Sequence, residues 1–411
     1  MIKAYQRRSE IEQLFMAFLI SDRTHIYNAV VNTMKTGGFE LLEYGNDYNL
    51  IWTGYTQVED ILLLNKYQKI NHFPNSVNLG RKDLFWTNIL RMKVKYPDHF
   101  NITPHSWVLP TDYEEFEQIR KLSGMDERMF ILKPSASSCG RGIRVVQGSH
   151  KFANREETIV SIYVDRPLLI KSKKFDMRVY VVVTSFNPLR VYMYQEGLAR
   201  FATENYTNDP TILKNKFVHL TNFSINKRNL KNYVKNDGKN MALQNDGDGE
   251  GMVDEDPEQE SSSKWSLRFL KQYISKKYGK ERVKQIFEGC NDAVIKTLIC
   301  TEPNIIKEMN KCGNRQKCCF EVYGFDIMFD DELNPWVLEV NCLPSLSSSS
   351  MFDKQVKTML ICDTFTLIGI RGYNKQLYRK KDNEPVREEE PEFNQTMELL
   401  EVEKLGGCKP I

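Results

Sequence analysis

The chain has 411 residues, 41% of them hydrophobic, and a formal net charge of only +3 at pH 7. This length is more than one small core needs and is enough for two or three domains. No run of about 18 apolar residues occurs and no segment has the pattern of a signal peptide, so the sequence argues against a secreted and against a membrane-spanning protein. The nine cysteines form no C-x-x-C pair, which favours a reducing compartment.

The charges are unevenly distributed along the chain. Residues 245–260 (NDGDGEGMVDEDPEQE) contain eight acids and no base, and residues 382–403 are also rich in acids. The rest of the chain is therefore distinctly basic. Such a surface is typical of proteins that bind an anionic partner, which could be a nucleic acid, a membrane surface or an acidic polypeptide.

The first part of the chain predicts a small α/β unit. Residues 9–19 and 23–35 have helical apolar spacing, and residues 38–54 contain two short apolar runs separated by a Gly-Asn-Asp turn, which predicts strand, turn and strand. Residues 71–97 then run from a loop into a helix with basic side chains. These are Arg81, Lys82, Arg91, Lys93 and Lys95.

From about residue 106 the chain becomes rich in short β-branched or aromatic runs bounded by Pro, Gly, Ser and Asn. The runs are SWVLP, MFILKP, GIRVV, TIVSIYV, PLLI, MRVYVVVTS and LRVYMYQEG. They predict a central sheet.

Residues 229–263 are polar, acidic and poor in aromatic residues, so we expect a flexible insertion there. Its acids imitate the start of an EF-hand loop, but Pro257 stands where that loop needs a bidentate Glu, and KCGNRQKCC (residues 311–319) lacks zinc-ligand spacing. Beyond the insertion, helices are expected over 264–279, 283–299 and 354–369, strands over 320–330 and 335–341, and a charged tail after about 375.

A lysine at the end of a strand precedes a loop of small residues. Lys133 is followed by residues 135–142 (SASSCGRG) and then by a second strand, so the loop predicts a hairpin flap and not a Walker or Rossmann loop, which leads into a helix. Free amides of such a flap can bind phosphates beside the lysine. An ordinary hairpin with one basic residue is the alternative.

Three oxygen-bearing side chains are expected to converge on a second hairpin. The alternation of a strand places Glu339 and Asn341 on one face, and Asp326 can lie opposite them on the preceding strand. Carboxylate and amide oxygens suit Mg²⁺ that keeps some waters and binds phosphates. Buried acids satisfied by hydrogen bonds alone are the alternative.

The strand KKFDMRVYVVV carries charges on one face only. Alternation places Lys174, Asp176 and Arg178 on one side and Phe175, Met177 and Val179 on the other. Together with Arg200, these charges could stabilise an anionic intermediate. A solvated sheet face with a salt bridge is the alternative.

Five motifs in this order resemble the tubulin tyrosine ligase-like family of ATP-grasp ligases. They are KPSASSCGRGI, KFDMRVYVVVTSFNPLRVYMYQEGLARFAT, KFVHLTNFSINK, FEVYGFDIMFD and PWVLEVNCLPSL. The resemblance covers about residues 23–373 and is greatest to the polyglutamylases. It implies an α/β ATP-grasp fold with an N-terminal subdomain (1–80), a central subdomain (81–170) and a C-terminal subdomain (171–375). A charged tail that we expect to be disordered follows (376–411).

The resemblance also implies residue roles. For ATP they are Lys133, Lys174, the loop residues Ser138, Gly140, Arg141 and Gly142, and the adenine-edge strand Ser161, Ile162, Tyr163 and Val164. For Mg²⁺ they are Asp326, Glu339 and Asn341. For catalysis they are Arg178, Arg200, Lys174 and Asp176, and for substrate binding Lys82, Arg178, Arg200, His219, Thr221, Asn222 and Lys227.

The function implied by the resemblance is ATP-dependent addition of free L-glutamate to glutamate side chains in acidic tubulin tails, which the cations of residues 81–95 would attract. A monomer in the cytoplasm and cytoskeleton is expected, with the cilium, flagellum or basal body as further locations, and with neither nucleic acid nor membrane as partner. The alternatives are a tubulin glycine ligase, a glutamylase of other acidic proteins, and a microtubule-binding protein without catalysis.

Overall fold

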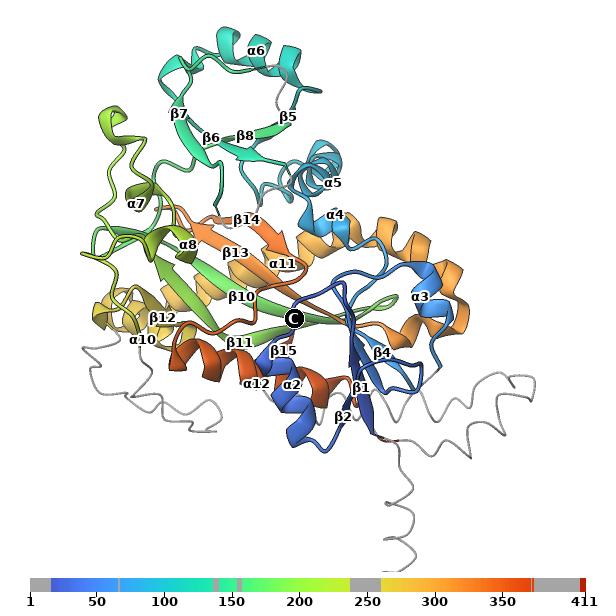
Figure 1. The fold of residues 1–411 in the computed structure, drawn as a ribbon. Helices are drawn as coiled ribbons and strands as arrows, with labels where there is room; N and C mark the ends of the chain where they lie inside the picture. The colour runs from blue at the N-terminus through green and yellow to red at the C-terminus, as the bar shows by residue number, and fades with distance from the viewer. Residues whose placement is uncertain are drawn as a thin grey trace, which may run out of the picture.

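The computed structural model of the chain describes residues 16–65, 67–135, 140–153, 157–236, 260–370, 372 and 407–411. In this part the strands form two four-stranded sheets and one seven-stranded sheet. Figure 1 shows the second four-stranded sheet above the large central sheet, with the N-terminal sheet beside it. The mixture of sheets and helices confirms the expected α/β class and agrees with an ATP-grasp fold.

The N-terminal sheet has the strand order β2-β1-β3-β4 and parallel pairing throughout. Its strands are β1 (Ala17–Ile20), β2 (Glu40–Leu42), β3 (Leu50–Trp52) and β4 (Lys69–Ile70), and its helices are α2 (Asn28–Thr36) and α3 (Val58–Leu62). The helix expected over 9–19 is wrong where it overlaps β1, and its residues 9–15 lie outside the described part. The two expected strands are confirmed, but β1 lies between them.

The second sheet is antiparallel, in the order β5-β8-β6-β7. Its strands are β5 (Ser106–Leu109), β6 (Met129–Pro134), β7 (Arg144–Gln147) and β8 (Thr158–Ile162). Helix α6 (Tyr113–Leu122), which no expectation included, packs Phe116 against Trp107 and Phe130 on one face. The short helix α4 (Val77–Gly80) and the expected α5 (Lys82–Lys95) precede this sheet, and the 3₁₀ turn η1 (Met125–Glu127) follows α6.

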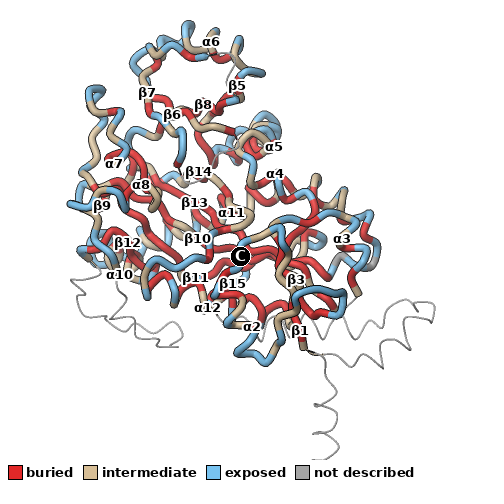
Figure 2. The backbone as a smooth tube through the Cα atoms, viewed as in Figure 1, coloured by how far each residue is buried: buried red, intermediate tan, exposed pale blue. Residues whose placement is uncertain are grey.

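The central sheet has the strand order β12-β11-β10-β13-β14, with β9 and β15 paired at its margins. The strands are β9 (Leu169–Ile170), β10 (Lys173–Phe186), β11 (Leu189–Phe201), β12 (Lys264–Ser266), β13 (Glu321–Phe329), β14 (Pro335–Asn341) and β15 (Cys408–Pro410). Figure 2 shows that β10, β11 and β13 are buried along much of their length. The strands expected from the β-branched runs are confirmed, but the runs up to residue 162 form the second sheet and only the later ones join the central sheet. The helix expected over 264–279 is wrong at its start, because Lys264–Ser266 form β12.

Helices cover the two faces of the central sheet differently. Met177, Val179 and Val181 face α10 (Leu267–Tyr278) and α11 (Lys280–Met309) in one apolar cluster. Tyr180 and Val182 on the opposite face pack against α12 (Met351–Leu367). Because side chains alternate along β10, the charged residues Lys174, Asp176 and Arg178 lie on the same face as α12. They precede Tyr180 and Val182, the β10 residues that α12 covers.

Two expected flexible regions are partly ordered. Residues 229–236 and 260–263 of the expected insertion are described and hydrogen-bonded, for example between Val234 and Ser263, whereas 237–259 lie outside the described part. Within the expected tail, residues 407–411 form β15 on β11. The remaining elements are η2 (Pro210–Ile212), α7 (Lys216–His219), α8 (Phe223–Asn226) and η3 (Asn310–Cys318). No helix of the described residues is long and apolar enough to cross a membrane.

A buried carboxylate joins the N-terminal region to the central sheet. Glu321, the first residue of β13, is 0% exposed. Its Oε1 lies 2.7 Å from Nδ1 of His72, and its Oε2 accepts hydrogen bonds from the Phe73 amide and the Tyr323 hydroxyl, both at 2.9 Å. Each donor would be unsatisfied inside the protein without this side chain.

We therefore expect Glu321→Ala to lower the free energy of unfolding by about 3 kcal/mol, because it leaves buried donors without an acceptor. Urea unfolding followed by circular dichroism measures the change. Glu332→Ala is the matched control, because Glu332 pairs with Arg166 at the surface and exposed pairs contribute little. An equal loss of stability in the two variants would contradict the role of Glu321.

Candidate active site

One row of charged residues crosses the central sheet from edge to edge. The strand pairing aligns Lys264 with Arg200, Arg200 with Asp176, Arg178 with Asp326, and Asp326 with Glu339. Directly opposite residues of antiparallel strands point to the same face of a sheet. Five strands thus contribute charged side chains to a single surface, as the alternation in residues 174–178 predicted for β10.

The centre of this row is a buried network of two carboxylates and two guanidinium groups. Arg200 donates from Nε and Nη2 to Asp176 at 2.7 and 2.6 Å, and its Nη2 lies 2.7 Å from Oδ2 of Asp326. Arg178 donates to both Asp326 oxygens, at 2.5 and 3.1 Å. Burial alone would raise the pKa of the Asp326 carboxyl, but Arg178 and Arg200 outweigh it and hold that pKa well below its usual value.

Residues 219–226 connect the buried charged network to Gly140, which belongs to the loop expected to bind phosphate. Thr221 donates its hydroxyl to Oδ2 of Asp176 at 2.6 Å. A Cβ atom on Gly140 would lie 2.6 Å from Ile225 and 3.0 Å from Oδ1 of Asn222, so only glycine, at φ +71°, allows this close approach. Gly140 of the flap therefore contacts α8. Gly142 also has a positive φ, and Arg141 is exposed, whereas Ser138 lies outside the described residues.

Two buried lysines have lowered pKa values. Lys174 donates to the Tyr163 hydroxyl at 2.9 Å, and burial, assisted by Lys133, lowers its pKa to about 7. Lys133 reaches from β6 to within 3.4 Å of the Leu338 carbonyl oxygen on β14, and burial lowers its pKa to about 8. An anion bound nearby would raise the pKa of each lysine and so favour its charged form.

His219 is also buried beside Lys174. Its Nδ1 lies 3.0 Å from the same Tyr163 hydroxyl, and burial and Lys174 lower its pKa to about 4. The imidazole is therefore neutral at pH 7 and lines the site as a polar, uncharged side chain. Lys227, another candidate from this motif, is exposed and lies over the Phe223 ring at 5.3 Å, a ring that Lys264 of the charged row also contacts at 4.1 Å.

The three candidate metal ligands lie together on β13 and β14. Asp326 and Glu339 are directly opposite each other, and Asn341 is opposite Gly324, whose carbonyl oxygen accepts the Asn341 amide at 3.2 Å. Glu339 Oε2 lies 3.2 Å from Nζ of Lys82. Two carboxylates and one amide oxygen on one face fit a hard cation that keeps part of its water shell. In the described residues no cluster of three His, Cys, Asp or Glu side chains suits a metal.

A second cationic group was missed by the sequence analysis. Lys264 donates to both Asp353 oxygens, at 2.9 and 3.2 Å, and to Ser349. Lys357, one helical turn after Asp353, donates to the Ser347 carbonyl, and burial lowers its pKa to about 8. A signal was present, since Asp353 and Lys357 are spaced i, i+4 on one helix. Two of the serines after Pro344, Ser347 and Ser349, bind these charged groups.

The segment expected to bind the adenine edge, residues 161–164, lies where the second sheet meets the central sheet. Ser161 is hydrogen-bonded to Ser106, and the amides of Ile162 and Tyr163 donate to the carbonyls of His105 and Met129. These groups are engaged within the protein, so other backbone groups near Val164 would have to bind a base.

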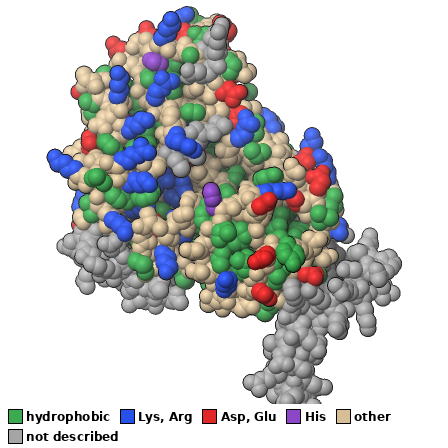
Figure 3. Space-filling model, in the orientation of Figure 1, with side chains coloured by type: hydrophobic (Ala, Val, Ile, Leu, Met, Phe, Trp, Pro, Cys, Tyr) green, Lys and Arg blue, Asp and Glu red, His purple; other side chains and the backbone are tan. Residues whose placement is uncertain are grey.

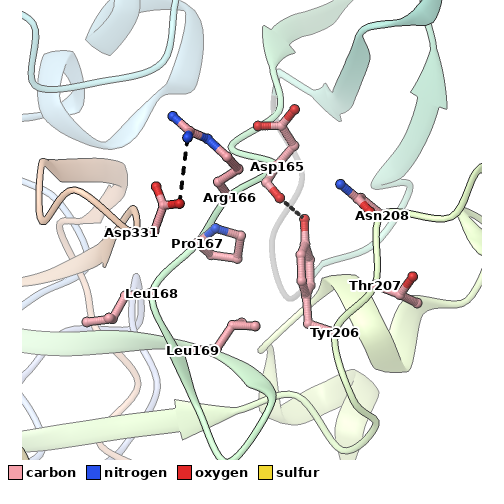
Figure 4. A pocket seen from close by; sticks show the side chains of 9 residues that line it. All are labelled: Asp165, Arg166, Pro167, Leu168, Leu169, Tyr206, Thr207, Asn208 and Asp331. Atoms are coloured by element: carbon pink, nitrogen blue, oxygen red, sulfur yellow. Dashed lines mark hydrogen bonds and ion pairs between the residues drawn. The ribbon is translucent and has the colours of Figure 1, made fainter.

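A cavity of about 540 Å³ begins at the next residue, Asp165 (Figure 4). The link from β8 to β9 forms one side of it, and Tyr206, whose hydroxyl donates to the Asp165 carbonyl at 2.8 Å, forms another. Arg166 points towards Asp331 across its rim at 3.8 Å.

Comparison with known proteins identifies the family. The sequence profile of the Tubulin-tyrosine ligase family matches residues 61–248 and 240–376. The chain belongs to this family. The resemblance noted from the five motifs is therefore confirmed.

The relatives include a protein of Mus musculus named tubulin polyglutamylase TTLL5, which is 37% identical over 380 residues (88% of this chain and 27% of the relative). Human tubulin monoglutamylase TTLL4 is 36% identical over 343 residues (83% and 27%). Tubulin polyglutamylase ttll6 of Danio rerio is 34% identical over 409 residues (94% and 49%). The chain spans between about a quarter and a half of the length of these relatives.

We expect the affinity of the site for ATP to fall as the pH rises from about 6 to about 9, because Lys174 and then Lys133 lose the proton that makes them cationic. Isothermal titration with a non-hydrolysable ATP analogue measures this affinity. Lys174→Gln should bind more weakly at low pH and show a smaller decline with pH. A decline of the same size in the variant would show that Lys174 is not the titrating group.

Proposed function

We propose that this chain is an ATP-dependent ligase that joins glutamate to the γ-carboxyl of glutamate side chains in tubulin tails. The observation that carries the proposal is the buried charged row, in which Arg178, Arg200 and Lys264 lie beside the phosphate-site candidates Lys133 and Lys174. All substrates of such a reaction are anions. The relatives that carry the names of tubulin polyglutamylases and a monoglutamylase support the same reaction.

The nucleotide would lie between the second sheet and the central sheet. Lys133 extends from one sheet and Lys174 from the other, and the glycines after residue 139 bring the flap to α8. Asp326, Glu339 and Asn341 would hold Mg²⁺, which supplies neutralisation of phosphate charge when bound. The three-subdomain division (1–80, 81–170 and 171–375) is part of this proposal and places the nucleotide between the second and third units.

The reaction needs activation because a carboxylate and an amine do not condense at neutral pH. An oxygen of the acceptor γ-carboxylate attacks the γ-phosphorus of ATP, so that an acyl-phosphate forms and ADP leaves. The unprotonated α-amine of free glutamate then attacks the acyl carbon, the C–N bond forms, phosphate leaves and the nitrogen loses a proton. Both steps concentrate negative charge near Arg178 and Arg200, whose positions are fixed by Asp176 and Asp326.

The second cationic group favours glutamate over glycine or tyrosine as the amino acid. Free glutamate carries two carboxylates, whereas glycine and tyrosine carry one. The arginines of the row form one group of cations, and Lys264 with Lys357 on the adjoining helix forms another. In the second group two lysines share one carboxylate, Asp353, so one positive charge is not balanced within that group. A second carboxylate on the substrate would balance this charge, which favours glutamate over substrates with a single carboxylate.

The acceptor and the cellular partners follow from the same chemistry. Tubulin tails are acidic and extended, which suits a cleft lined by cations, and such a substrate would bring the enzyme to the cytoskeleton. A glycine ligase would not need Lys357. A microtubule-binding protein without catalysis would not need the buried Asp176–Arg200–Asp326 network, because burying three charges for surface binding alone offers no gain.

Incorporation of labelled amino acids into microtubules tests the proposal. We expect the wild-type chain to incorporate glutamate with ATP, and glycine and tyrosine at background level. Lys357→Gln should raise the KM for glutamate about 10- to 100-fold, as expected for the loss of a charge-assisted hydrogen bond, with the KM for ATP unchanged.

The matched control is Lys354→Gln, which removes an exposed lysine from the same helix. It should leave the KM for glutamate unchanged. Incorporation of glycine at the rate of glutamate would overturn the assigned substrate, and an unchanged KM in Lys357→Gln would overturn the role of the second cationic group.

A further inference from the structure

Residues 210–236 form a basic segment beside the charged row, which we call the basic wall. This segment contains six Lys or Arg residues and no Asp or Glu. Lys214, Lys216, Lys227, Arg228 and Lys231 are all exposed. Figure 3 shows Lys and Arg side chains gathered over the region where Figure 1 places α7 and α8. We propose, building on the function proposed above, that this basic wall binds the glutamate-rich acceptor polypeptide and leads it to the charged row.

Buried hydrogen bonds fix the backbone on which these cations stand. Asn226 accepts from the amide and the hydroxyl of Thr203 at 3.0 and 2.8 Å, and donates to the Leu220 carbonyl at 2.7 Å. Asn229 donates to Thr203 and to Glu204. Arg228 and Lys231 therefore project from an anchored segment. Glu204, an acid that contacts this segment, is already engaged by Asn215 and Asn229.

Residues 221–236 form the outer part of the basic wall, and both of its ends contact the candidate active site. At residue 221 the Thr hydroxyl donates to Asp176, and at residue 236 the Asn side chain donates to the Lys264 carbonyl at 3.0 Å. Asp176 and Lys264 belong to the charged row of the central sheet. The cations between these two anchors thus form an arc along the rim of the site, where a polypeptide must pass to present a side chain to it.

The helix expected to attract the acceptor has its cations engaged elsewhere. On α5, Arg91 donates to the Cys300 carbonyl at 2.7 Å, Lys93 donates to Asn101 at 2.8 Å, and Lys95 lies over the Tyr96 ring. Lys82 pairs with Glu339. The basic wall is therefore the better surface for the acceptor than the helix that the sequence favoured.

An acidic polypeptide fits the wall better than a nucleic acid does. Binding of single strands relies on exposed aromatic rings that stack on bases. The aromatic residues of the outer part, Phe223 and Tyr233, are half-buried and pack on each other at 5.9 Å between ring centroids. The exposed apolar residues are instead aliphatic, Leu230 at 89% and Val234 at 43% exposure, and suit the methylene groups of glutamate side chains.

The double variant Arg228→Gln/Lys231→Gln tests the proposal in the full chain. Its control, Arg282→Gln/Lys284→Gln, removes the same charge from exposed positions on α11, which covers the opposite face of the central sheet. Fluorescence anisotropy of a labelled glutamate-rich peptide reports binding without catalysis. Glutamate incorporation into the same peptide gives KM and kcat.

We expect the wall variant to weaken peptide binding about five- to twentyfold at low salt, to raise the KM for the peptide similarly, and to leave kcat and the KM for ATP unchanged. Its affinity should also depend less on salt than that of the wild type. The control variant should bind as the wild type does.

Equal affinities of the wall variant and the control variant would overturn the proposal. It would also be overturned if a single-stranded oligonucleotide of equal charge displaced the peptide at lower concentration than unlabelled peptide does, since the wall would then be a nucleic-acid surface. Because anisotropy needs no turnover, a chain that binds the peptide through the wall but incorporates no glutamate would refute the proposed function and leave the wall supported.

Discussion

The Asp326 carboxylate, bound by Arg178 and Arg200 together, is the interaction on which the rest of the site depends. It lies on β13 and its partners come from β10 and β11, so three strands must keep their register for the contacts to form. A slip of one residue on any of them would turn its charge towards the apolar layer under α10 and α11. The network thus specifies the sheet as well as the site.

The layers around the row explain why these charges can be buried. Apolar side chains fill the opposite face of β10, and α12 covers the neighbouring part of the charged face with Phe352 and Val356. Where this cover ends, Lys264 donates to Asp353, and Lys357 also interacts with that carboxylate. Lys133 extends from the second sheet to the Leu338 carbonyl on β14. Burial lowers the pKa of each of these lysines. An anionic substrate would raise the pKa of these lysines again, so binding and protonation are coupled in this site.

Much of the site could be predicted from the sequence because its main pattern is local. The alternation of Lys174, Asp176 and Arg178, and of Glu339 and Asn341, follows from the period of a strand and needs no knowledge of the fold. The partners of Asp326 could not be predicted in the same way, since they depend on which strands become neighbours. Lys264 and Lys357 were missed for this reason, because an apolar helix and the end of an insertion meet only in the folded chain.

The errors in the fold have the same origin. Residues 17–20 form a strand between two others, although a short apolar run after a helical pattern does not distinguish a strand from the end of a helix. Residues 407–411 join β11 across a long separation in sequence, where composition indicated a disordered tail. Cys408 is 0% exposed in the apolar cluster with α12. Burial of this one side chain therefore stabilises the pairing of β15 with β11 despite the polar character of the neighbouring residues.

The central claim is that the charged row activates an acceptor carboxylate as an acyl-phosphate. An acceptor peptide with ¹⁸O in its glutamate side-chain carboxylates tests this directly, with mass spectrometry of the inorganic phosphate released on ligation. Transfer of one ¹⁸O atom from the carboxylate to phosphate for each amide bond formed is the predicted result. Unlabelled phosphate, or label in AMP, would contradict it, because the carboxylate oxygen would then never have been bonded to the γ-phosphorus.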